Sequence, residues 1–179
     1  HDLEMLNSYR DFRQEAEKNN FNYFLEVFNP QTKTGLNQSQ LGEYVNDCIL
    51  KTLAGQLKSE RPLFLKIAYN GPKAMEELAS YDPKNLIVGI LGGGKGTTRD
   101  CFELISKSCK YGAKVALFGR KINLAEDQKL IVKTMRDVVN GMTSNEGVKF
   151  YHDQLKKKKI KPDRSLDKDL MITEKVLKL

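Results

Sequence analysis

Four short apolar runs, each followed by a segment of helical periodicity, constrain the fold of this chain more than any other feature. The runs cover residues 23–28, 63–68, 86–91 and 114–118, and nearly every position in them is apolar. Strands that are buried on both faces of a parallel sheet have this composition. Because the runs alternate with helical segments, the sequence predicts an α/β fold in which helices cover a parallel sheet.

The segments between these runs carry apolar residues every three or four positions, as amphipathic helices do. We expect helices over about residues 3–16, 41–57, 72–79, 97–112, 123–138 and 144–156. Pro72 suits a first helical position, and Thr97 with Asp100 forms a capping box. Asn123 and Glu126 are expected to begin the fifth of these helices.

Two architectures fit this order of elements. One is a small, complete, doubly wound sheet of the flavodoxin type, and the other is half of a (β/α)8 barrel, which needs about 250 residues when complete. The chain has 179 residues, begins with His1 and places a helix before its first strand. We therefore expect a processed or truncated chain, with a (β/α)4 unit and a leading helix over residues 1–156 and a basic, partly ordered tail over residues 157–179.

Composition narrows the kinds of partner. The net charge is +7, and much of the excess lies between positions 156 and 168, where no aromatic residues interleave with the lysines. We interpret this segment as a solvated tail and expect no nucleic-acid partner, although a tail that binds another protein stays open. No apolar run approaches the roughly 18 residues of a membrane span, and no signal-peptide pattern opens the chain, so we expect no membrane partner.

The cysteines and histidines predict no special chemistry. Cys48, Cys101 and Cys109 are an odd number without CxxC spacing, which favours reduced thiols in a cytoplasmic protein. We expect no metal site and no cofactor, because no Cys–His or carboxylate cluster has ligand spacing. His152 is expected on the surface.

Lys66 is the most unusual residue of the predicted strands. It is the fourth residue of the apolar run 63–68, where a charge is costly unless it meets water or a partner. One interpretation is an ammonium at an edge strand or paired with Glu26 on the preceding strand. The other is a nucleophilic amine, since desolvation and nearby positive charge both favour the neutral form of lysine.

Two consecutive loops resemble anion-binding sites. Residues 92–98 (Gly-Gly-Gly-Lys-Gly-Thr-Thr) follow the third run and lead into a helix, so backbone N–H groups, Lys95 and nearby Arg99 could surround a phosphate. Gly119 and Arg120 follow the fourth run, and a guanidinium suits bidentate binding of phosphate. Neither loop has the Walker A or the dinucleotide-binding pattern, so a plain strand-to-helix turn is the alternative.

Taken together, these loops resemble the carboxyl-terminal half of the class I (Schiff-base) aldolase barrels. The likeness covers residues 20–140 and lies in Leu65-Lys66 within a strand, a strand ending in Gly92-Gly93 and a strand ending in Gly119-Arg120. The group includes archaeal-type fructose-bisphosphate, deoxyribose-phosphate and tagatose-bisphosphate aldolases. Asn29 stands where archaeal-type members tend to have a tyrosine acid, and the Gly94-Lys95-Gly96 sequence also departs from the family.

The resemblance implies barrel strands five to eight and a lyase of carbohydrate metabolism. It implies that Lys66 forms a Schiff base with a phosphorylated sugar or keto compound. We expect Glu26 to transfer protons instead, since Asn29 stands in place of the tyrosine acid. The resemblance places the substrate phosphate on Gly92, Gly93, Gly119 and Arg120, and we expect Lys95 of the same glycine-rich loop to bind it as well. The missing strands would come from a homo-oligomer or from an amino-terminal half-barrel. A non-catalytic phosphate- or nucleotide-binding α/β module is the alternative, and a bare assembly subunit is a third.

Overall fold

The computed structural model describes residues 2–179, and its sheet follows the order of the chain. The strands are β1 (Leu25–Val27), β2 (Leu65–Ile67), β3 (Val88–Leu91) and β4 (Val115–Leu117). They pair in the order β1-β2-β3-β4, and every neighbouring pair is parallel. Each strand lies within its predicted run but is shorter. The α/β class with parallel strands that alternate with helices is therefore confirmed.

The helices also follow the predicted order. They are α1 (Asp2–Lys18), α2 (Gln38–Leu53), α3 (Pro72–Tyr81), α4 (Thr98–Lys110), α5 (Arg120–Asn123), α6 (Gln128–Val139), α7 (Ser144–Lys157) and α8 (Leu166–Asp169), with short 3₁₀ segments η1 (Lys58–Glu60) and η2 (Lys175–Lys178). The Thr97–Asp100 capping box and Pro72 at the first turn of α3 are confirmed. The predicted start of α6 is wrong: Asn123 ends the short helix α5, and Asp127 caps α6 by accepting from the N–H of Leu130 at 2.9 Å.

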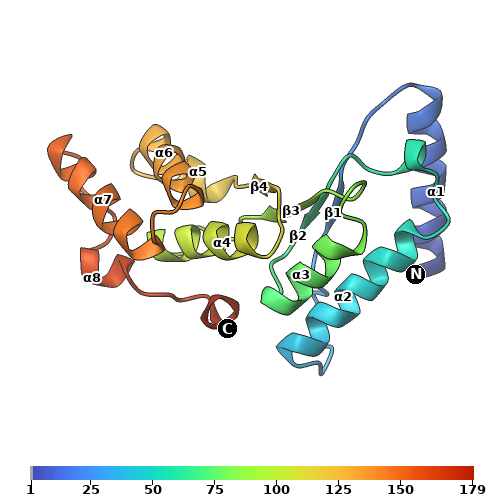
Figure 1. Ribbon diagram of the computed structural model, residues 1–179, viewed down its shortest axis with the longest axis horizontal. Helices are drawn as coiled ribbons and strands as arrows, with labels where there is room; N and C mark the ends of the chain where they lie inside the picture. Colours follow the sequence, from blue (N-terminus) through green and yellow to red (C-terminus); the bar gives the residue numbers. More distant parts are fainter. Residues whose placement is uncertain (1) are drawn as a thin grey trace.

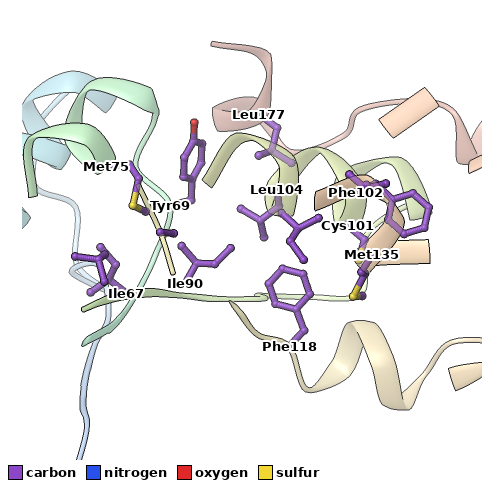
Figure 2. Packing of buried hydrophobic residues seen from close by; sticks show 14 of the residues in the cluster. Ile67, Tyr69, Met75, Ile90, Cys101, Phe102, Leu104, Phe118, Met135 and Leu177 are labelled. Atoms are coloured by element: carbon purple, nitrogen blue, oxygen red, sulfur yellow. The ribbon is translucent and has the colours of Figure 1, made fainter. Parts of the chain in front are cut away.

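Helices α2, α3 and α4 lie in chain order along one side of the sheet (Figure 1). Leu65 and Ile67 of β2 face them and are almost fully buried, as are Val88 and Ile90 of β3. Figure 2 shows the core running from Ile67 and Met75 at one end to Phe102 and Met135 at the other. Burial of this continuous apolar cluster is the main stabilising contribution to the fold.

The opposite face of the sheet carries aromatic side chains beside one ion pair and is only partly covered. Because successive side chains of a strand point to opposite faces, Phe24, Glu26 and Phe28 share this face on the β1 segment, as Phe64 and Lys66 do on β2. Phe28 is 62% exposed, and the rings of Phe24 and Phe64 stack with 4.9 Å between their centroids. We call this surface the open face. Parallel sheets are normally covered on both faces.

The strand order bears on the choice between the two architectures. A doubly wound sheet reverses its strand order at a switch point, as in the order 2-1-3-4-5. Within residues 2–179 the order β1-β2-β3-β4 contains no reversal. The described sheet therefore lacks the strand reversal that defines the flavodoxin-type alternative.

The carboxyl-terminal segment packs on the domain. Leu177 is fully buried, and the hydroxyl of Thr97 donates to the carbonyl of Met171 at 2.8 Å. The prediction of a surface His152 is wrong: its side chain is 10% exposed and Nε2 lies 2.9 Å from Oδ2 of Asp169. The histidine is covered because α8, a later segment of the chain, folds back onto α7.

Helix α1 lies at one end of the molecule and contacts the short segment η1 (Figure 1). It is held by Arg13, which forms an ion pair with Glu60 at 3.0 Å, while Leu3 and Met5 remain largely exposed.

Among residues 2–179, no helix has the length and apolar character to cross a membrane. The three cysteines are free thiols, and burial raises the pKa of Cys101 to about 12, so this thiol stays protonated at neutral pH.

Candidate active site at the carboxyl ends of the strands

Lys66 projects from the middle of β2 onto the open face. Its neighbours Leu65 and Ile67 point into the helix-covered core, so alternation turns Lys66 the other way. Its Nζ lies 2.8 Å from Oε1 of Glu26, its register partner on β1. The two side chains are 22% and 30% exposed. The predicted pairing with Glu26 is confirmed, whereas the edge-strand interpretation is wrong because β2 pairs with both β1 and β3.

The glycine-rich loop after β3 combines a packing glycine with two open ones. A Cβ on Gly92 would lie 2.8 Å from the ring of Phe118, so this residue lets β3 and β4 approach closely. Gly93 has φ +65°, a conformation that favours glycine. A Cβ on Gly93 or Gly94 would meet no atom within 4 Å. Within residues 2–179 the N–H groups of Gly93 and Gly94 form no backbone hydrogen bond, so they can donate to a ligand.

The basic residues of this loop are already paired. Lys95 forms an ion pair with Asp163 of the carboxyl-terminal segment. Arg99 donates from Nε to Oε2 of Glu103, one turn further along α4, at 3.1 Å. These cations are therefore bound to carboxylates of the chain itself.

Gly119 and Arg120 follow β4 and are both exposed. Among the residues that the structure describes, Arg120 forms no ion pair, and the space beside Gly119 is open. Of the basic residues predicted in the two loops, Arg120 is thus the one that pairs with no carboxylate in the described part of the chain.

The predicted site residues lie within neighbouring strands or in the loops that follow them. Lys66 is in register with Gly89, and Gly92 follows three residues later, directly after the end of β3, which corresponds to roughly 10 Å along a strand. Gly119 and Arg120 follow the next strand, β4. No hydrogen bond within residues 2–179 joins Lys66 to either loop, so a ligand would have to span the interval between them.

Asn29 and Asn70 link the carboxyl ends of β1 and β2. Their amides exchange two hydrogen bonds, of 2.8 and 2.9 Å, and Gln38 donates to the same Asn70 oxygen at 3.3 Å. A surface cavity of about 340 Å³ opens beside Asn70, between the first turns of α2 and α3. This pairing of Asn29 with Asn70 was not predicted, because Asn70-Gly71-Pro72 has the sequence of an ordinary turn.

Lys121 was also missed. Its side chain is 1% exposed, and its Nζ lies 3.3 Å from Oε1 of Glu174 and 3.4 Å from the carbonyl oxygen of Lys95. A buried ammonium needs such partners. Through its contact with Lys95, Lys121 connects the two predicted anion-binding loops. In the sequence, the one sign of such a role was its position directly after Arg120.

Asp100 ties the carboxyl-terminal segment to the glycine-rich loop. Its carboxylate accepts from the N–H groups of Thr97 at 3.0 Å and Thr173 at 2.8 Å, and from the Thr173 hydroxyl at 2.5 Å. Burial by itself would raise the pKa of Asp100, but these hydrogen bonds, with one from the N–H of Glu174, hold it below its ordinary value of 3.8.

The lowered pKa of Asp100 predicts a specific loss of stability in acid. A carboxyl whose pKa is lower in the folded than in the unfolded state stabilises the fold above its unfolded pKa, and this contribution disappears as the pH falls through the folded value. Asp100→Asn should therefore lower the free energy of unfolding at pH 7 and flatten its decline below about pH 4. Urea denaturation between pH 7 and pH 2.5 measures both effects. Parallel curves for the two proteins would contradict this assignment.

No group of three or more histidine, cysteine or acidic side chains with metal-binding geometry occurs within residues 2–179. No protein-family model matches this chain, and no curated protein matches it either.

Proposed function

We propose that this chain is an aldolase-like carbon–carbon lyase that acts on a phosphorylated sugar or keto compound through a Schiff base on Lys66. The observation that carries this proposal is the position of the Lys66 ammonium on the open face, 2.8 Å from a carboxylate and one strand away from unpaired loop N–H groups. An amine, an adjacent proton-transfer group and an anion-binding loop are the parts that imine chemistry on a phosphorylated carbonyl compound requires.

The proposed reaction uses Lys66 and Glu26 in turn. Neutral Nζ attacks the substrate carbonyl carbon, and the resulting carbinolamine loses water to give an iminium ion. The bond between the carbon next to the iminium and the carbon beyond it then breaks, and its electron pair converts the iminium into an enamine. In the same step the hydroxyl of the leaving carbon gives its proton to the Glu26 carboxylate, and that carbon leaves as a carbonyl. Glu26 is within reach of Nζ to move protons in the formation of the imine. Protonation of the enamine and hydrolysis release the second product and regenerate the amine.

The substrate phosphate is assigned to the two loops. The N–H groups of Gly93 and Gly94 and the unpaired guanidinium of Arg120 are the available donors, and the open space beside Gly119 leaves room for an oxyanion. Gly92 contributes through close packing of the strands. Lys95 contributes a cation only after it leaves Asp163.

Borohydride reduction in the presence of dihydroxyacetone phosphate tests the proposal. It converts an imine into a stable secondary amine, which peptide mass mapping locates. We expect the adduct on Lys66. A label on another lysine, or none, contradicts the covalent mechanism.

We propose further that the sheet is half of a (β/α)8 barrel. The sequential parallel order, the row of helices on one side and the partly uncovered open face all agree with the wall of such a barrel. Four further parallel strands would pair with the free edges of β1 and β4 and cover the open face. We propose either a second copy of this chain or preceding residues of a longer chain as their source.

Phe28→Glu distinguishes these sources. If a second copy supplies the strands, the chain should form dimers in light scattering, and a charge at Phe28 should convert them to monomers because it cannot be buried unpaired. Phe21→Glu, at an exposed phenylalanine in the loop before β1, is the control and should leave the dimers intact. If the unaltered chain and Phe28→Glu are both monomeric, a second copy of the chain is excluded as the source of the strands.

The competing function is a phosphate-binding module without catalysis. The ion pair between Lys66 and Glu26 favours it, since a paired ammonium needs no catalytic role to occupy this position. In that case phosphate esters would protect the fold against unfolding equally well after Lys66→Met.

A further inference from the structure

We infer that the carboxyl-terminal segment, residues 163–174, competes with the substrate phosphate for the glycine-rich loop and so regulates the proposed site. This inference rests on the proposed function, because it concerns the same phosphate site. Three groups in or beside the loop that could bind an anion are occupied by carboxylates from this one segment.

The first of these contacts is the ion pair between Lys95 and Asp163. Lys95 belongs to the loop itself, whereas Asp163 lies 68 positions later in the chain, and their side chains are 26% and 54% exposed. Exposed ion pairs contribute little to stability, because water screens them and both side chains lose freedom. A phosphate at this loop can therefore replace the Asp163 carboxylate without unfolding the domain.

The other two contacts lie deeper. Oδ1 of Asp169 accepts from the N–H of Thr98, the first residue of α4, at 2.8 Å. The Glu174 carboxylate pairs with the buried ammonium of Lys121 at 3.3 Å. These carboxylates hold the segment against the loop and add negative charge behind it, which disfavours a phosphate dianion nearby.

Asp163 is the part of the segment that can move most easily. Its backbone N–H donates to Glu126 at 2.9 Å, so the main chain is anchored while the side chain can rotate away. Arg120 and the N–H groups of Gly93 and Gly94 remain free of these carboxylates. We therefore expect a phosphate to bind first to these open donors and then to displace Asp163 from Lys95.

Asp163→Asn tests this competition. Removal of the competing charge should strengthen binding of inorganic phosphate about two- to fivefold, the range expected for an exposed ion pair. The affinity is measured by protein NMR titration at constant ionic strength, since salt screens such effects. Asp163 is largely exposed, so the variant is expected to fold.

Glu43→Gln is the matched control. Glu43 forms another exposed ion pair, with Lys73 at 2.7 Å, and the variant removes the same charge away from the loops. It should leave the phosphate affinity unchanged. An equal gain in both variants would indicate a general charge effect and would overturn the inference, as would no gain in Asp163→Asn.

Arg120→Met separates this inference from the proposed function. If phosphate binding depends on Arg120 but Asp163→Asn does not strengthen it, the competition is wrong and the phosphate site stands. If binding is insensitive to Arg120, or absent from both the unaltered chain and Asp163→Asn, the proposed phosphate site fails and the inference fails with it.

Discussion

Replacement of Lys66 by methionine is expected to abolish borohydride trapping of dihydroxyacetone phosphate and to lower carbon–carbon cleavage by about 10³-fold or more, the size of effect seen when a nucleophile is removed. The reason is that no other lysine of the described sheet lies on the open face beside a carboxylate. Methionine preserves most of the side-chain length and apolar volume. The loss would therefore report chemistry and not the fold.

Two further variants make this result specific. Lys73→Met removes an exposed lysine that also pairs with a glutamate, and trapping should remain intact. Glu26→Gln should slow turnover while adduct formation on Lys66 remains detectable, because the amide cannot transfer protons. If Lys66→Met were trapped as well as the unaltered chain, the Schiff-base mechanism would be excluded and the phosphate-binding module would remain.

Phe102→Ala is expected to cost about 3–5 kcal/mol of stability, as large-to-small changes at fully buried aromatic residues do. Phe102 on α4 is completely buried, and a Cβ on Gly147 of α7 would lie 3.0 Å from its ring. Since α7 follows the sheet in sequence, this contact joins the end of the domain to its centre. Urea denaturation measures the loss, and the melting temperature should fall by roughly 10 °C.

Phe21→Ala provides the comparison for this variant. Phe21 is 64% exposed, and its truncation should change stability by less than about 1 kcal/mol. Similar losses for the two variants would mean that the helix-covered side of the sheet is not the principal core.

Much of the fold could be predicted because it depends on local pattern. The strands at Leu65–Ile67 and Val88–Leu91 lie within apolar runs of strand length, and the ends of α4 carry the signals of a capping box and a closing glycine, Gly112 at φ +104°. The start of α6 was harder to predict, since Asn123 and Asp127 both have side chains that cap helices. Asn123 instead forms the last residue of the short helix α5.

The candidate site could be predicted only in part. Lys66 and Glu26 were paired correctly, because equal positions in adjacent parallel strands lie side by side. The partners of Lys95, Lys121 and His152 could not be predicted, since their carboxylates lie between 17 and 68 positions away in sequence. Periodicity says nothing about which distant loops meet.

The amino-acid sequence alone determined the α/β class, the parallel strands, the position of Lys66 within an apolar strand and the two glycine loops, because hydrophobic periodicity and turn chemistry act over a few residues. Only the tertiary structure decided that Lys66 faces away from the helices, that Lys95 is paired while Arg120 is free, and that residues 163–174 lie against the glycine-rich loop. Those features depend on long-range packing, in which burial and charge pairing between distant segments outweigh local preference.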